Sequence, residues 1–173
     1  SVCVEDIMTP RTVVIAASEN ASIENYLLDN PKLRVSRIPI FQNENRDEIT
    51  GYVLRSDLLS AVINGESEKS ISAFRRDIMI VEEAFPLPEL LNRLLTRREH
   101  IAVVVDEFGG LSGIVTTEDA IETLLGLEIV DESDDEVDLR TRARAEWEKR
   151  ARARGLVEET FSPSSYSEPI ADE

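Results

Sequence analysis

The chain has 173 residues, of which 42% are hydrophobic, so it can form one compact domain or two small ones with a real core. Its net charge of −16 argues against a general nucleic-acid binder, because phosphate contacts need a basic surface. A single cysteine and a single histidine argue against an internal disulfide and a metal site of the His/Cys type. The sequence also contains no apolar run of transmembrane length and no signal peptide, so we expect a cytosolic setting.

Taken in chain order, the first half of the sequence predicts a strand, a helix, two strands and a second helix. Residues 12–15 are expected to be extended. Ile23, Tyr26 and Leu27 then follow the helical period until Pro31 stops it. The apolar runs 37–41 and 51–54 are typical of strands, and an apolar helical stretch follows them.

The second half of the chain repeats this order. Residues 77–81 are expected to be extended, and a row of leucines then follows the 3.6-residue period of a helix. Apolar runs at 101–105 and 111–116 flank a loop that contains Gly109 and Gly110, which is the pattern of a β-hairpin. The periodic leucines are Leu87, Leu90, Leu91, Leu94 and Leu95.

The junction after the hairpin is the most informative point of the sequence. A helix begins there, with Thr116 or Thr117 as its N-cap and acidic residues in its first turn. Thr116 and Asp119 have the T-x-x-D spacing of a capping box, which by itself only stabilises a helix start. The same junction presents free backbone N–H groups and a positive dipole end, so it can also bind an anionic or hydroxyl-rich ligand.

An internal repeat predicts the fold class. Residues 51–59 align with residues 113–121 at an offset of 62, and residues 37–41 align with residues 100–104 at an offset of 63. Each unit therefore has the order strand, helix, strand, strand, helix. One unit is too small to be secure alone, so we expect an α+β fold in which two units pack about a pseudo-twofold axis. The predicted boundaries are 1–68 for the first repeat and 69–131 for the second.

The remaining residues, 132–173, form a charged tail. Acidic and basic side chains spaced i,i+4 predict a helix over 138–154 that is closed by Gly155, with Trp147 as its only large apolar residue. We expect this helix to be solvated or frayed, and the alternative is that Trp147 docks on the repeats or on another chain. From Leu156 onward we expect disorder.

These motifs resemble a tandem pair of CBS domains, a Bateman module, and most closely the pair in the CorC and CNNM membrane proteins of magnesium and divalent-cation transport. The resemblance is carried by four segments spanning residues 4–132. It implies a cytoplasmic domain of a cell-membrane protein whose N-terminal transmembrane domain precedes this sequence. The segments are Val-Glu-Asp-Ile-Met-Thr-Pro-Arg (4–11), Ser-Arg-Ile-Pro-Ile (36–40), Asp-Glu-Phe-Gly-Gly-Leu-Ser-Gly-Ile-Val-Thr-Thr-Glu-Asp (106–119) and Glu-Ile-Val-Asp-Glu (128–132).

The resemblance also implies a ligand: an adenosine nucleotide, ATP (or ADP or AMP), with magnesium carried by the nucleotide. The Asp119 carboxylate suits the ribose hydroxyls, Thr116 the ribose or a phosphate, and Arg37 the phosphates. The family pattern places five further residues around adenine and ribose. These are Thr9, Val35, Ser36, Pro39 and Ile114.

The related second cleft is expected to be degraded, which leaves one site per chain. Asp57 is present in the first repeat, but Leu54 replaces the hydroxyl residue, and the alignment puts His100 where the other repeat has Arg37. An enzyme is disfavoured, because the sequence has neither a nucleophile elbow nor a phosphate-binding glycine loop. The resemblance implies a homodimer through the CBS pair, and a ligand-free dimerisation module is the alternative function.

Overall fold

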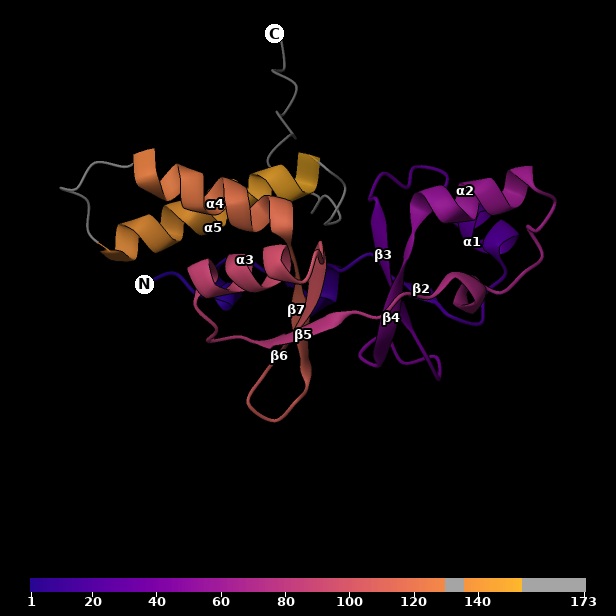
Figure 1. Ribbon diagram of the computed structural model, residues 1–173, viewed down its shortest axis with the longest axis horizontal. Helices are drawn as coiled ribbons and strands as arrows, with labels where there is room; N and C mark the ends of the chain where they lie inside the picture. The colour runs from indigo at the N-terminus through magenta and orange to yellow at the C-terminus, as the bar shows by residue number, and fades with distance from the viewer. Residues whose placement is uncertain (130–135, 154–173) are drawn as a thin grey trace, which may run out of the picture.

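Two small β-sheets lie side by side in the computed structural model, and helices cover one face of each sheet (Figure 1). The structure describes residues 1–129 and 136–153. In chain order the elements are η1 (Val4–Asp6), β1 (Thr9–Pro10), η2 (Arg11–Val13), β2 (Ala17–Ser18), α1 (Ile23–Asp29), β3 (Arg37–Phe41), β4 (Ile49–Leu54), α2 (Arg55–Ile63), η3 (Ile71–Phe74), β5 (Met79–Glu82), α3 (Leu87–Thr96), β6 (Ile101–Val105), β7 (Leu111–Thr116), α4 (Thr117–Ile129) and α5 (Glu136–Ala153), where η denotes a 3-10 helix.

The two sheets share one plan. The first has the strand order β2-β3-β4 and the second the order β1-β7-β6-β5. In each sheet an antiparallel hairpin, β3–β4 or β6–β7, is flanked by a parallel strand, β2 or β5. This arrangement confirms the expected α+β fold and its repeated order of elements.

One predicted element is wrong. Residues 12–15 do not form the first strand; residues 11–13 form η2, and the strand that pairs with β3 is β2, a few residues later. The reason is tertiary, because Val14 packs with Tyr52 and Ile114 in an apolar cluster between the two sheets instead of joining a strand ladder.

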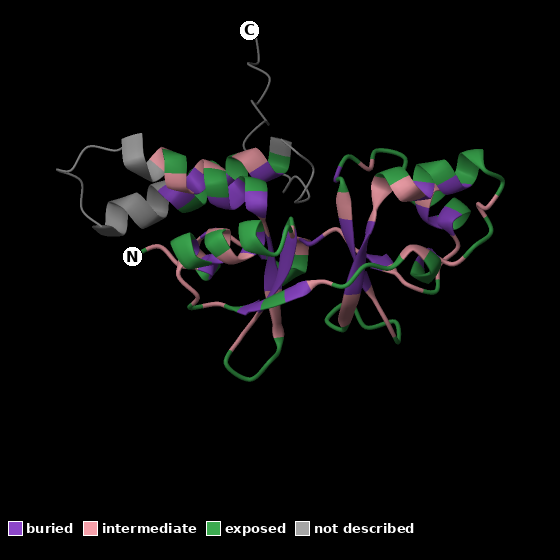
Figure 2. Ribbon diagram, in the orientation of Figure 1, coloured by how far each residue is buried: buried purple, intermediate pink, exposed green. Residues whose placement is uncertain are grey.

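Three apolar clusters hold the structure together. The largest lies between the second sheet and its helices and includes Leu87, Leu90 and Leu94 of α3, as the leucine period predicts. A second cluster lies between the first sheet, α1 and α2, and a third joins the two sheets to each other. Buried residues therefore gather on the sheets and on the inner faces of the helices (Figure 2).

Each sheet packs against a segment that belongs, by sequence, to the other predicted repeat. Strand β1, at the start of the chain, pairs with β7, and Ile7 just before it is buried in the cluster of the second sheet. Conversely, Ile71 in η3 lies after the predicted boundary at residue 68, yet it packs into the cluster of the first sheet. The packing units in space therefore differ from the sequence ranges 1–68 and 69–131, which remain a prediction about the repeats.

Strand pairing changes the alignment of the repeats by one residue. Arg37 pairs with Leu54, and Ile101 pairs with Thr116. Because Leu54 and Thr116 are equivalent at the offset of 62, Arg37 is equivalent to Ile101, an offset of 64 instead of the predicted 63. The backbone agrees, since Arg55 N donates to Ser36 O at 2.9 Å and Thr117 N donates to His100 O at 3.0 Å. The residues after Arg37 in β3 and all residues of β6 are apolar, so the sequence pattern does not distinguish the two alignments.

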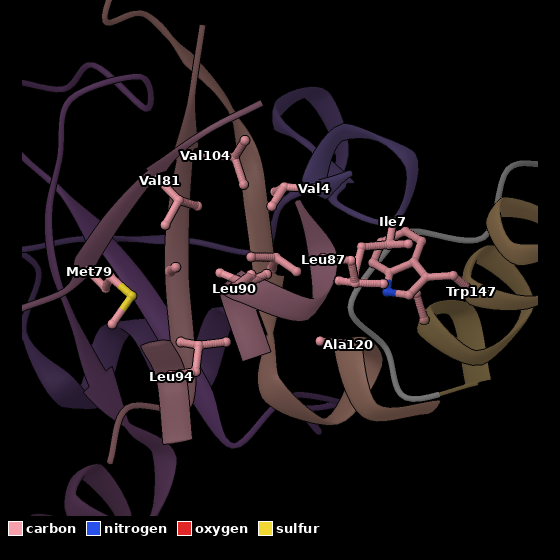
Figure 3. Packing of buried hydrophobic residues seen from close by; sticks show 13 residues of the cluster. Val4, Ile7, Met79, Val81, Leu87, Leu90, Leu94, Val104, Ala120 and Trp147 are labelled. Carbon is pink, nitrogen blue, oxygen red and sulfur yellow. The ribbon is translucent and has the colours of Figure 1, made fainter. Parts of the chain in front are cut away.

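The C-terminal helix α5 is part of the core of the second unit. Its residues Ala143, Trp147 and Ala151, spaced four apart, are buried, and only 1% of Trp147 is exposed. The indole belongs to the same cluster as Ile7 and Leu87 (Figure 3). The expected solvated or frayed helix is therefore wrong, and the docking alternative is confirmed. Gly155, the expected cap, and the disorder expected from Leu156 lie outside the described residues.

Polar contacts add to this docking. Arg144 Nη2 donates to the carbonyl oxygen of Glu5 at 2.9 Å, and Arg150 Nε lies 2.7 Å from Glu122 Oε2 of α4. Helix α5 thus contacts both η1 and α4. Within the described part of the chain we find no helix with the length and apolarity that a bilayer span requires.

Candidate functional site

Thr116 and Asp119 are joined by hydrogen bonds at the start of α4. Thr116 Oγ1 donates to Asp119 Oδ2 at 2.6 Å, and the Asp119 backbone N–H donates to Thr116 Oγ1 at 3.4 Å. Since α4 begins at Thr117, Thr116 is the N-cap residue. The capping function considered for the T-x-x-D pattern is therefore present. It does not exclude ligand binding, because Thr116 keeps part of its surface exposed.

A cavity of about 240 Å³ opens beside Thr116. Its wall brings together segments that are far apart in the sequence: the stretch leading into β3, the residue before β6 and the junction between β7 and α4. The lining residues are Arg34, Val35, Ser36, Arg37, His100, Thr116 and Glu118. Four of the predicted site residues, Val35, Ser36, Arg37 and Thr116, therefore line one cavity.

Arg37 is less exposed than Arg34 and His100, the other basic residues of this cavity's wall. Its Nε atom is buried and has no hydrogen-bond partner among the described residues. Buried polar groups are normally hydrogen-bonded, so an unpaired guanidinium nitrogen beside a cavity points to an anionic ligand. Arg34, also on the wall, adds positive charge, and Glu118 is the one carboxylate of the lining.

The other four predicted residues do not line the cavity. Thr9 and Ile114 face each other in the β1–β7 ladder and are 1% and 3% exposed, and Pro39 is buried in β3. Asp119 is also buried, with 0% exposed, and lies behind the Thr116 hydroxyl. A ligand in the cavity therefore reaches Thr116 before it reaches Asp119.

Sequence reasoning missed three residues of the cavity wall: Arg34, His100 and Glu118. His100 had been placed in the second cleft opposite Arg37, but it lines the same cavity as Arg37. The corrected register explains this, because His100 is equivalent to Ser36 and not to Arg37. Arg34 could have been found from its position three residues before Arg37, because two nearby arginines are typical of a phosphate site.

Comparison with known proteins identifies the family. The family model for the CBS domain matches residues 69–126, which lie within the predicted second repeat. Over 152 residues the chain is 37% identical to UPF0053 protein sll1254 of Synechocystis and 36% identical to the magnesium and cobalt efflux protein CorC of Escherichia coli K12. These alignments cover 88% and 87% of this chain but only 43% and 51% of the two relatives, so the chain spans about half of their length.

A solved structure extends the match to both repeats. The CBS domain of a bacterial CNNM/CorC family Mg²⁺ transporter in complex with ATP superposes with a TM-score of 0.67 at 35% identity, over 72% of this chain and 87% of that one. The same two-sheet arrangement is thus present in a protein that resembles this chain in sequence. Together with the repeat and the family model, this match shows that the chain belongs to the CBS-domain modules of the CorC/CNNM family.

Proposed function

We propose that the cavity beside Thr116 binds an adenosine nucleotide, with Mg-ATP as the main ligand, and that binding makes the module a regulator of a CorC/CNNM-like membrane protein. The observation that carries this proposal is the unpaired, buried Nε of Arg37 next to the N-terminus of α4. In a chain of net charge −16, a cavity with two arginines on its wall is a local exception that suits phosphate groups.

The arrangement supports distinct roles for its residues. Arg37 and Arg34 would bind the phosphates, and a guanidinium can bind two oxygens at once. Thr116 would contact the ribose. Asp119 would accept from a ribose hydroxyl after its hydrogen bond from Thr116 is replaced by one from the ligand.

Magnesium enters this proposal with the nucleotide. The phosphates bring further negative charge to an acidic chain, and a bound divalent cation cancels part of that repulsion. We therefore expect ATP to bind more tightly with magnesium than without it, and ADP and AMP to depend less on the metal.

The remaining parts of the proposal concern the whole protein. The relative CorC is a magnesium and cobalt efflux protein, and we infer that this chain serves a divalent-cation transporter from the cytoplasmic side of the cell membrane. Thr9 is held in the sheet that carries Thr116, so the N-terminal segment offers a route from the cavity towards a preceding transmembrane domain.

A ligand-free dimerisation module is the second candidate function, favoured by apolar side chains on α2 and α4. These helices lie on the same side of the molecule (Figure 1), and this surface would suit a homodimer. Nucleotide binding and dimerisation are compatible, so this candidate replaces the first only if no nucleotide binds. The exposed residues are Leu59, Val62, Ile63, Ile121 and Leu125.

Calorimetry with ATP, ADP and AMP, each with and without magnesium, tests the proposal. We expect one site per chain and a thermal midpoint that rises with ligand, since a ligand at about a hundred times its Kd stabilises the folded state by about 2.7 kcal/mol. Arg37→Gln should weaken ATP binding, and Arg97→Gln, at the exposed residue that follows α3, is the control with the same charge change. No binding heat and no shift in midpoint with any nucleotide would leave the dimerisation module, which sedimentation would then test.

A further inference from the structure

In the first unit, which is formed by the sheet β2-β3-β4 and its helices, a backbone segment pairs with β4 in the same way as β1 pairs with β7 beside the candidate site. In the second unit Thr9 pairs with Ile114; in the first, Arg76 exchanges two hydrogen bonds with Tyr52, at 2.8 and 3.0 Å. Tyr52 is equivalent to Ile114 at the offset of 62. Arg76 therefore occupies in the first unit the place that Thr9 occupies in the second.

The glycines beside these pairs mark the same crossing. A Cβ at Gly113 would overlap the carbonyl oxygen of Thr9, and a Cβ at Gly51 would overlap the carbonyl oxygen of Arg76. Both positions need glycine because another backbone segment lies directly on the strand. The equivalence of Thr9 and Arg76 thus rests on backbone geometry and not only on counting residues.

Arg76 differs from Thr9 in what its side chain contacts. Its Nη2 lies 3.2 Å from Oδ2 of Asp57, the residue equivalent to Asp119 at the third position of α2. Leu54, equivalent to Thr116, makes no side-chain cap bond. In the first unit, therefore, a guanidinium of the chain itself pairs with the carboxylate equivalent to Asp119, the carboxylate that would accept from a ribose in the proposed site.

We propose that the side chain of Arg76 fills the second cleft, which the repeat places at Asp57 and Leu54, and that it thereby limits nucleotide binding to one site per chain. This inference rests on the proposed function, since it assigns the number of sites. Arg76 acts by charge, through its pair with Asp57, and by volume, because its side chain is longer than that of Thr9, the residue at the equivalent backbone position.

The charge and the volume of the Arg76 side chain contribute unequally to the exclusion of a nucleotide. The Arg76 and Asp57 side chains are 50% and 34% exposed, and an ion pair this exposed changes affinity by about fivefold at most, the equivalent of about 1 kcal/mol. Charge alone is therefore a weak barrier, and most of the exclusion comes from the space that the side chain fills.

The test is the number of sites measured by calorimetry with AMP and with ATP. AMP is included because the second cleft would have Ile101 at the position equivalent to Arg37 of the candidate site. A second cleft opened by substitution would therefore lack the arginine that suits a longer phosphate chain. Leu54→Thr with Arg76→Thr introduces the residues that the second unit has at these two positions, Thr116 and Thr9, and we expect the number of sites to rise from one to two. Leu54→Thr with Arg76→Gln removes the charge but keeps most of the volume, and its second site should be clearly weaker.

Two further variants locate the new binding event. Adding Asp57→Asn to the double variant should weaken binding at the new site alone, whereas adding Asp119→Asn should weaken binding at the original site alone, each by up to about a hundred-fold. Arg97→Thr, with the same charge change at the residue that follows α3, should keep one site. A double variant that folds, as judged by its thermal melt, and still binds at one site would overturn the role of Arg76.

This design separates the inference from the proposed function. If the unmodified chain binds no nucleotide, the proposed function fails. An Asp57-dependent site in the double variant would then still support Arg76 as the occupant, and its absence would reject that role as well.

Discussion

The carbonyl oxygen of Thr9 lies so close to Gly113 that a methyl group on Gly113 would overlap it. This contact brings the N-terminal segment onto the strand that ends at Thr116. The start of the chain is therefore attached to the second unit, beside the candidate site, and its attachment depends on a residue without a side chain.

Gly113→Ala should separate β1 from β7 and destabilise the fold. Overfilling a closely packed position typically costs about 1 to 3 kcal/mol, which urea unfolding would detect. Gly126→Ala is the matched control, because Gly126 lies within α4, where alanine favours the helix by about 0.5 to 1 kcal/mol. Equal effects of the two substitutions would contradict the close approach at Gly113.

Asp119→Ala should weaken nucleotide binding about ten- to a hundred-fold, because it removes a charge-assisted hydrogen bond that contributes about 1.5 to 3 kcal/mol. Thr116→Val should weaken it as well, since Thr116 lines the cavity. Asp57→Ala, at the equivalent position of the first repeat, is the control and should leave affinity unchanged. Unchanged affinity in a folded Asp119→Ala variant would leave that residue with its capping function alone.

Trp147→Ala should destabilise the chain by about 3 to 5 kcal/mol, the usual cost of removing a large buried aromatic side chain. Loss of this contact would release α5 from η1 and α4. Lys149→Ala, on the exposed side of the same helix, should stay within about 0.5 kcal/mol of the unmodified chain. Thermal or urea unfolding of the two variants would show whether α5 is part of the cooperative core.

Tyr26 makes stability depend on alkaline pH. Burial raises the pKa of Tyr26 to about 12 from an ordinary value of 10, and Arg46 offsets only part of this effect. Above pH 10 the unfolded chain releases the phenolic proton while the folded chain keeps it. The free energy of unfolding should therefore fall by about 1.4 kcal/mol per pH unit between these two pKa values, with no such loss below them.

Tyr26→Phe should remove this loss. Its hydroxyl is buried and has no hydrogen-bond partner within the described residues, so near neutral pH the substitution should be neutral or slightly stabilising. Urea unfolding of both proteins at about pH 8 and about pH 11 would measure the difference. Parallel changes in the two proteins would show that Tyr26 is not the group responsible.

Several features were predictable from the sequence because they depend on residues that lie close together along the chain. The leucine period of α3, the glycine-containing hairpin β6–β7 and the T-x-x-D start of α4 each depend on residues within one or two turns of each other. The internal repeat then indicated two similar units, and the motif at 106–119 identified the family to which the chain belongs. Four residues of the candidate cavity could be named for the same reason.

Other features were decided by contacts between distant segments, which local patterns do not encode. After Arg37 the residues of β3 are apolar, as are all residues of β6. Only the pairing of these strands with β4 and β7 therefore shows that Arg37 corresponds to Ile101 and that His100 joins the cavity. The charge pattern of α5 favoured a solvated helix, and only the apolar cluster around Ile7 explains why Trp147 is buried. The exchange of β1 and of η3 between the units has the same origin. An apolar cluster receives Ile7 and Ile71, and a glycine on the receiving strand leaves room for the backbone of Thr9 or Arg76.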